Sequence, residues 1–210
     1  MKIKRALLLI TVFVAGMTTL GVELAAARLL DPFFGNSLII WAVLIGTVLL
    51  YLTVGYYVGG KWADRKPYYR VLYQITAWAS LLIGLSPFIA RPVLSWSVQG
   101  FAEYSIGLLA GSLLGAIALF SVPVTLLGCV SPFAIRLSMA EKSVESSGDI
   151  AGRLYALSTV GSLVGTFLPV LVLIPSIGTR NTFLFLAFIL MAVALAGLFA
   201  ELKARALPYL

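Results

Sequence analysis

One acidic side chain, Glu23, lies within the first long apolar run of the chain, residues 6–30. A carboxylate in a membrane-spanning helix is costly, so such a group faces protein or water and marks a functional or structural site. The residues three, four and seven positions away are small apart from Leu20, namely Gly16, Thr19, Leu20, Ala26 and Ala27. Small residues let a second helix approach closely. We therefore expect Glu23 to point into a helix bundle, where it either makes a structural hydrogen bond or belongs to a transport site.

Three further charged residues lie at the ends of apolar runs. Arg28 follows Glu23 by five residues, about 140° further round a helix, so we expect it to reach water at the membrane boundary instead of pairing with Glu23. Asp64 and Arg65 belong to a charged turn, residues 61–67. There they can cap neighbouring helix ends and tie the turn to the bundle, and a plain charged turn is the alternative interpretation.

The longest polar stretch, residues 131–152, contains Arg136 and is followed directly by Arg153 and Tyr155. It is longer than a connection between two bundle helices requires. We therefore interpret it as a cytoplasmic loop that is either a docking segment for a partner protein or a solvated amphipathic linker. Arg153 and Tyr155 are suited to binding a phosphate or a carboxylate, and the alternative is an anchor at the inner membrane interface.

The residue types that enzymes use most often are scarce. The chain has no histidine, which removes the commonest general base and a common zinc ligand. Its single cysteine, Cys129, forms no internal disulfide and is read as a small buried hydrophobe. The glycines of residues 55–60 lie inside an apolar run and not after a strand, so they are not a dinucleotide-binding loop. We expect no catalytic residue, no cofactor and no metal.

The composition is that of an integral membrane protein. Of the 210 residues 61% are hydrophobic and 11% are charged, whereas soluble domains have about 25% charged residues. A spanning helix needs about 20 apolar residues. Six windows qualify, at about 6–30, 37–60, 70–90, 104–130, 153–175 and 181–200. We expect one all-α domain over residues 1–210, a bundle of six transmembrane helices.

Basic residues are distributed unequally between the two sides that this topology defines. Three lie on one side, Arg28, Arg91 and Arg180. The other twelve of the 15 lysines and arginines lie on the side of the two termini. Because cytoplasmic loops are enriched in lysine and arginine, we expect both termini in the cytoplasm and the protein in the plasma membrane. The net charge of +7 then reflects topology and needs no nucleic-acid partner.

Glycine pairs four residues apart predict where helices pack closely. They occur in the second, fourth and fifth runs, as Gly55-x3-Gly59, Gly107-x3-Gly111-x3-Gly115 and Gly161-x3-Gly165. Such spacing places small residues on one helix face, and we interpret it as packing and not as a substrate site. Pro123 and Pro169 should kink or locally open the fourth and fifth helices.

The charged turn after the second run resembles a motif of another membrane protein family. Gly60-x3-Asp64-Arg65 is similar to the cytoplasmic loop motif between the second and third helices of major facilitator transporters. The sequence departs from that motif at Pro67, where a glycine is expected. The resemblance implies half of a transporter of that kind.

A longer series of motifs resembles the membrane region of spermidine-synthase-like fusion proteins. The first half has Glu23-x4-Arg28, Pro32-x-Phe34-Gly35-x-Ser37, Trp41 and Gly55-Tyr56-x2-Gly59-Gly60-x2-Ala63-Asp64-Arg65. The second half has Ser131-Pro132-x3-Arg136, Gly152-Arg153-Leu154-Tyr155-Ala156-x4-Gly161-x3-Gly165 and Ile174-Pro175-x2-Gly178. In that family a multi-helix region precedes a cytoplasmic aminopropyltransferase-like domain. The glycine loop and paired carboxylates that such a domain needs do not occur in this chain, so we expect no aminopropyl transfer by it.

Two functions follow as expectations. The first is a non-catalytic membrane subunit that anchors or supports a partner protein, contacting it through residues 131–152 or through helix faces. The second is a half-transporter that dimerises and moves polyamines or another small solute, with Glu23 as the intramembrane carboxylate. Apart from the lipid bilayer, the sequence names no partner and no solute.

Overall fold

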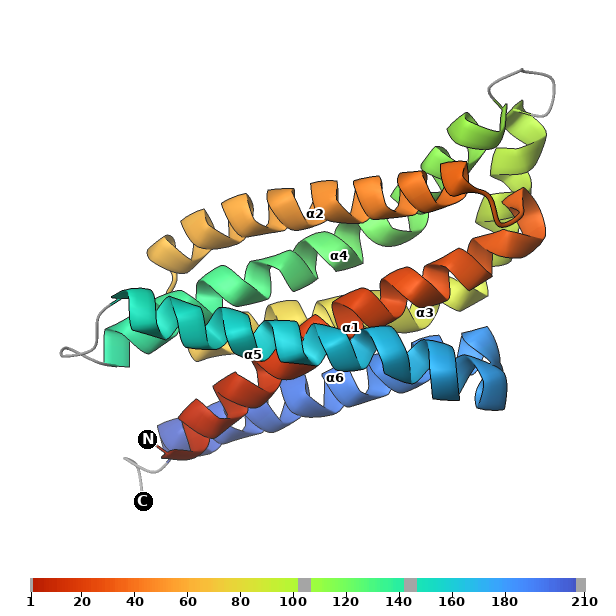
Figure 1. The fold of residues 1–210 in the computed structure, drawn as a ribbon. Helices are drawn as coiled ribbons and strands as arrows, with labels where there is room; N and C mark the ends of the chain where they lie inside the picture. The colour runs from red at the N-terminus through yellow and green to blue at the C-terminus, as the bar shows by residue number, and fades with distance from the viewer. Residues whose placement is uncertain (1, 102–106, 142–146, 207–210) are drawn as a thin grey trace.

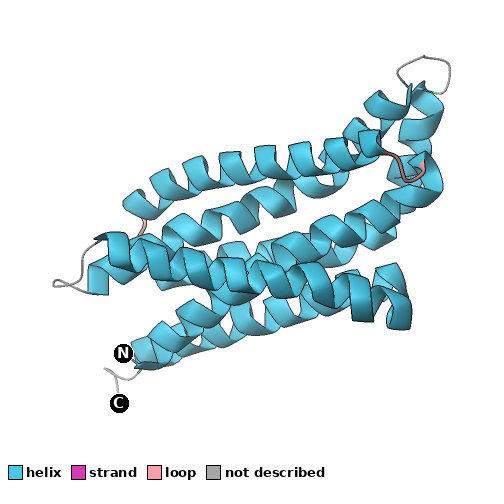
Figure 2. Cartoon of the chain, viewed as in Figure 1, coloured by secondary structure: helices cyan, strands magenta, loops and turns pink. Residues whose placement is uncertain are grey.

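The computed structural model describes residues 2–101, 107–141 and 147–206, and every element in this part of the chain is helical (Figures 1 and 2). The elements are α1 (Lys2–Phe34), α2 (Leu38–Arg65), α3 (Tyr69–Phe101), α4 (Gly107–Glu141), α5 (Ser147–Leu168), the π-helix η1 (Pro169–Leu173) and α6 (Ile174–Ala206). The long helices lie roughly along one common axis (Figure 1). The prediction of an all-α fold is confirmed for these residues.

Several segments are long and apolar enough to cross a membrane. Five are found in the described chain, at Lys4–Phe34, Leu38–Arg65, Tyr69–Gly100, Gly107–Ala140 and Ser147–Lys203. The last has 57 residues and includes Gly178, whose φ of 80° and ψ of 165° are not helical. At that point the chain folds back, so that α6 runs opposite to α5 (Figure 1). The turn predicted at residues 175–180 therefore exists, and glycine supplies the positive φ that it requires.

Most helices are longer than the apolar windows from which they were predicted, and α3 and α4 extend furthest at their C-terminal ends. α3 continues through Arg91 to Phe101, although it contains Pro87 and Pro92. α4 continues to Glu141 and α5 begins at Ser147, so the prediction of a loop at 131–152 is wrong, and only residues 142–146 of it lie outside the described chain.

The helical extension of α4 has a physical reason in its own pattern of apolar residues. Phe133, Ala134 and Leu137 lie on one face at helical spacing and are almost fully buried, with at most 2% of each residue exposed. Burial of this face stabilises the helix beyond the apolar window. The polar residues Ser131, Arg136 and Ser138 of the same stretch lie outside this buried face and lower the mean hydropathy, which is why hydropathy alone gave a loop.

α1, α5, α4, α3 and α6 each contact the next in a closed ring, and α2 packs mainly against α4. α4 packs against α2 on one side and α3 on the other, α3 packs against α6, and α1 packs against both α6 and α5. The backbones of α2 and α5 do not come close to each other in the described part of the chain, although Tyr56 of α2 and Tyr155 of α5 line one cavity. α1 makes only limited contact with α2 and α4.

Glycines bring two pairs of helices into close contact, as predicted. A Cβ on Gly55 would lie 2.8 Å from the Cα of Gly128, which joins α2 to α4. A Cβ on Gly161 or Gly165 would collide with backbone carbonyls of α1, at Phe13 and Met17 respectively. The interiors of proteins are close-packed, so these positions accept no larger side chain without movement of a helix.

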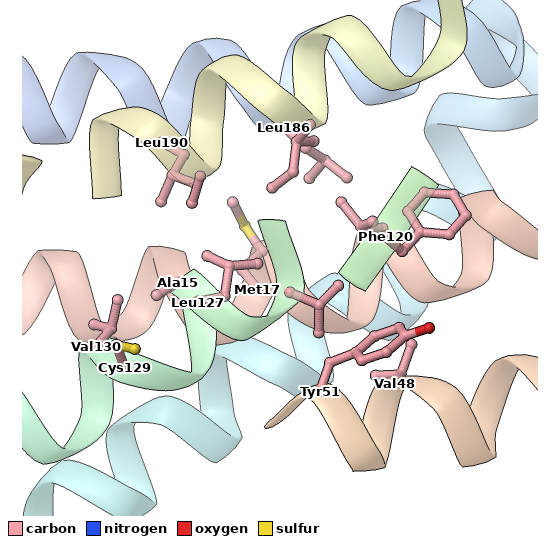
Figure 3. Packing of buried hydrophobic residues seen from close by; sticks show 14 of the residues in the cluster. Ala15, Met17, Val48, Tyr51, Phe120, Leu127, Cys129, Val130, Leu186 and Leu190 are labelled. Carbon is pink, nitrogen blue, oxygen red and sulfur yellow. The ribbon is translucent and has the colours of Figure 1, made fainter. Parts of the chain in front are cut away.

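Between these glycine contacts lies an apolar core that all the long helices share. Its side chains include Val48 and Tyr51 of α2, Phe120 and Leu127 of α4, and Leu186 of α6, which point toward one another (Figure 3). Phe120 also stacks on Phe183 of α6 with 6.2 Å between the ring centroids. Both chain termini lie at one end of this bundle (Figure 1).

Candidate functional site

The end of the bundle at which both termini lie, called here the basic end, contains an ion pair between two of the predicted residues. The Nε of Arg136, on α4, donates a hydrogen bond to Oδ1 of Asp64, on α2, over 3.1 Å. Asp64 occupies the last turn of its helix, whose C-cap Lys66 donates its backbone N–H to the carbonyl of Trp62. Asp64 therefore fastens the end of α2 to α4 across 72 positions of sequence.

Arg65, the neighbour of Asp64, does not share in this contact. Its side chain is exposed, and it has no hydrogen bond or ion pair within the described residues. The predicted Asp64–Arg65 unit is thus two separate residues, one joined to α4 and one facing outward.

A cavity of about 310 Å³ lies beside the Asp64–Arg136 pair and is called here the basic-end cavity. It is lined by residues of three helices: Tyr56, Gly60 and Asp64 of α2, Pro132, Ile135, Arg136 and Met139 of α4, and Tyr155 of α5. Three of the predicted site residues therefore converge on one space. Tyr56 was not predicted as a site residue, although its four-residue spacing to Gly60 and then Asp64 places all three on one helix face.

Arg153 does not belong to this cavity. Its guanidinium forms two 3.1 Å contacts with the carboxylate of Asp149, one turn earlier on α5. Two such parallel contacts are the strong geometry for an arginine and a carboxylate. Arg153 and Tyr155 are therefore not brought together as a binding pair, because the backbone turns about 200° between residues two apart.

A smaller cavity of about 60 Å³, called here the seam cavity, continues from Tyr56 toward the middle of the bundle. Its lining is Ala15, Gly16, Thr19, Leu20, Leu52, Tyr56, Leu127, Ser131, Ser158 and Ser162. The Oγ of Ser162 donates to the carbonyl of Gly16 over 3.2 Å, which joins α5 to α1. The polar face of α5 was missed, although Ser158 and Ser162 are four residues apart and next to the predicted glycine pair.

Glu23 lies one helical turn beyond the seam cavity, on the same face of α1 as Thr19 and Leu20. It is half-buried, and within the described residues no hydrogen bond or ion pair reaches its carboxylate. Arg28 does not pair with Glu23, as helix geometry predicted, and its Nη1 lies 3.9 Å from Oδ2 of Asp31. The structural hydrogen bond, one of the two expectations for Glu23, is therefore not found among these residues.

A third cavity, of about 350 Å³, lies at the opposite end of the bundle and is called here the far-end cavity. Its lining is Leu24, Ala27, Arg28, Asp31, Asn36, Trp41, Val170, Ile174 and Pro175. The indole nitrogen of Trp41 donates to Oδ1 of Asn36 over 2.8 Å. Through Leu20 and Leu24, the face of α1 that carries Glu23 extends from the seam cavity to this one.

No family model, curated protein or solved structure matches this chain. The chemistry of the site thus has to be judged from its own residues. In the described ranges, no three His, Cys, Asp or Glu side chains are grouped so that they could hold a metal ion. What the residues around the cavities offer is charge pairing, hydroxyl and amide hydrogen bonds, and apolar contact.

Proposed function

We propose that the chain is a plasma-membrane protein with six transmembrane helices and both termini in the cytoplasm. Division of the segment 147–203 at Gly178 gives two antiparallel helices in place of one, and an even number of crossings agrees with termini at one end (Figure 1). The excess of lysine and arginine at the basic end supports a cytoplasmic orientation of that end.

For its role we propose a non-catalytic membrane subunit, similar to the membrane region of spermidine-synthase-like fusion proteins, that supports a cytoplasmic partner. The single observation that supports this role is the convergence of three motifs at the basic end. Asp64 comes from the first motif, Arg136 from the second and Tyr155 from the third, and all three line one cavity. Motifs that are far apart in sequence thus form one local structure at the end that would face a cytoplasmic domain.

The experiment is site-specific photocrosslinking in native membranes. A photoreactive residue in place of Arg65, which is exposed at the basic end, should capture one defined protein of the cell's cytoplasmic or membrane fraction. The control is the same probe in place of Trp96, 66% exposed toward the far end of α3. Capture from both positions alike, or from neither, would contradict a partner at the basic end.

A second function, a dimerising half-transporter for polyamines or another small solute, is favoured by the face of α1. On it the half-buried Glu23, which has no hydrogen bond or ion pair among the described residues, lies between the seam cavity and the far-end cavity. An intramembrane carboxylate beside polar cavities is the usual form of a cation pathway. A dimer would double the number of such carboxylates available to a multiply charged solute.

This function is tested by flux into proteoliposomes. Uptake of a labelled polyamine should fall at least tenfold in Glu23→Gln and be partly retained in Glu23→Asp, which keeps the charge. The same flux in Glu23→Gln as in the unaltered protein would exclude Glu23 from any pathway. Absence of flux from all three would leave the subunit role as the better account.

A further inference from the structure

We propose that the basic-end cavity is a binding site for an anionic phospholipid, with the phosphate against Arg136 and an acyl chain between α2 and α5. The inference names a ligand that neither proposed function assigns. It requires only that the bundle lies in a membrane.

The cavity reaches the surface of the bundle between α2 and α5. Its lining comes from α2, α4 and α5, and α4 contacts both other helices, whereas the backbones of α2 and α5 do not come close to each other in the described chain. Tyr56 of α2 and Tyr155 of α5 are 48% and 55% exposed. An opening between two lipid-facing helices admits a chain from the side, whereas a water-soluble ligand would need an entrance from the membrane surface.

The depth and lining of the cavity suit the upper part of a lipid. Asp64 and Tyr56 are eight residues apart on α2, which corresponds to about 12 Å along the helix. Over this distance the lining changes from the charged pair, past Pro132, to the tyrosine rings. Tyrosines at this depth are typical of the membrane–water interface, where a polar tip and an apolar ring are both needed.

Arg136 retains the donors that a phosphate requires. Its Nε is used by Asp64, but the two terminal nitrogens make no hydrogen bond in the described part of the chain, and 42% of its side chain is exposed. Guanidinium groups bind phosphate oxygens through paired N–H donors. The Asp64 contact holds the guanidinium at the cavity, so its orientation is set before a ligand arrives.

The charges beside the opening favour an anionic head group over a zwitterionic one. Asp64 is offset by Arg136, and Lys61, Arg65 and Lys66 of the same turn add three positive charges at the end of α2. Basic pockets between transmembrane helices at the interface are the usual sites for anionic head groups. A zwitterionic lipid would add an ammonium group to an already positive surface.

The test is retention of lipid by the purified full chain, measured by native mass spectrometry after exchange into phosphatidylcholine, with phosphatidylglycerol added in competition. We expect retained phosphatidylglycerol, and at least a fivefold loss of it in Arg136→Gln. The matched control is Arg91→Gln, an exposed arginine near the other end of α3, which should retain the lipid unchanged. Met139→Trp, which places a larger side chain in the cavity beside Arg136, should also lose it and serves if Arg136→Gln does not fold.

Three results would overturn the proposal. The first is equal retention of phosphatidylglycerol and phosphatidylcholine by the unaltered protein. The second is unchanged retention in both Arg136→Gln and Met139→Trp. The third is displacement of the lipid by millimolar inorganic phosphate, because the site would then recognise a free anion and not a lipid with its chain.

Discussion

At the scale of single residues, small and charged side chains have different roles in this protein. The glycines set the distance between helices, since Gly161 and Gly165 leave no space for a side chain against α1. The charged residues at the basic end join helices or face outward. In the Asp64–Arg136 pair, 73% of the Asp64 side chain and 42% of the Arg136 side chain are exposed. The pair therefore contributes more to positioning these two side chains than to the stability of the fold.

Gly165→Val should lower the free energy of unfolding by about 1–3 kcal/mol, because its side chain would overlap the carbonyl of Met17. The measurement is thermal or denaturant unfolding in detergent. Gly46→Val is the matched control, since a Cβ at Gly46 meets no atom within 4 Å. Equal stability of the two variants would show that α1 and α5 are not in close contact at Gly165.

The coupling between Asp64 and Arg136 should be small, about 0.2–1 kcal/mol, because both side chains are largely in contact with solvent. A double-mutant cycle with Asp64→Asn and Arg136→Gln measures it, and added salt should reduce it. A coupling well above this range that salt does not affect would mean that the pair is shielded from solvent, by a partner or a lipid.

At the scale of elements, the unusual helix is η1. Proline lacks the N–H that an α-helix needs and clashes with the preceding turn, and Pro169 is the first residue of the π-helix Pro169–Leu173. This agrees with the prediction that Pro169 opens its helix. α4 continues as an α-helix through Pro123, so the helix does not open at that residue. Wider helical turns occur often at functional sites, and Val170 of η1 lines the far-end cavity.

Pro169→Ala should convert η1 into regular α-helix and rotate the residues that follow it, by about 100° for one residue of register. The glycine contacts with α1 hold the part before it in place. We therefore expect a nitroxide at Leu171, now 67% exposed, to become less accessible to oxygen in the membrane. A nitroxide at Leu163, 54% exposed and ahead of η1, is the control and should not change. Unchanged accessibility at Leu171 would show that the sequence around Pro169 forms the π-helix without it.

At the scale of the whole molecule, the arrangement separates a basic end from an end with few charges. Both termini lie at the basic end (Figure 1), where Lys4 of α1 also pairs with Glu201 of α6 over 2.7 Å. This contact closes the bundle between its first and last helices. The backbones of α2 and α5 do not come close to each other in the described chain, and the proposed lipid would lie between them.

The topology predicts opposite results for reporters at the two ends. A fluorescent protein fused after the last residue should fluoresce, and alkaline phosphatase inserted at Gly35, in the turn between α1 and α2, should be active outside the cytoplasm. The reverse pattern would invert the orientation, and identical behaviour of both reporters at the two sites would mean an odd number of crossings.

Much of the architecture follows from local sequence. Apolar runs of spanning length can satisfy their backbone groups in a membrane only as helices or closed barrels, and the helical form was predictable from them. Glycine pairs at helical spacing identified close contacts, and Pro175 with Gly178 identified the turn near the start of α6, because each depends on residues that are neighbours in sequence.

The tertiary structure alone decided which distant residues meet. The ion pair Asp64–Arg136 depends on the packing of α2 against α4, whereas Arg153 finds its partner on its own helix. The separation of α2 from α5 likewise depends on how the helices of the described chain pack against one another. The chain by itself determined a helical membrane protein with a basic end; packing determined where that end has a cavity, because contacts between helices are set by shape across the whole bundle and not by spacing within one of them.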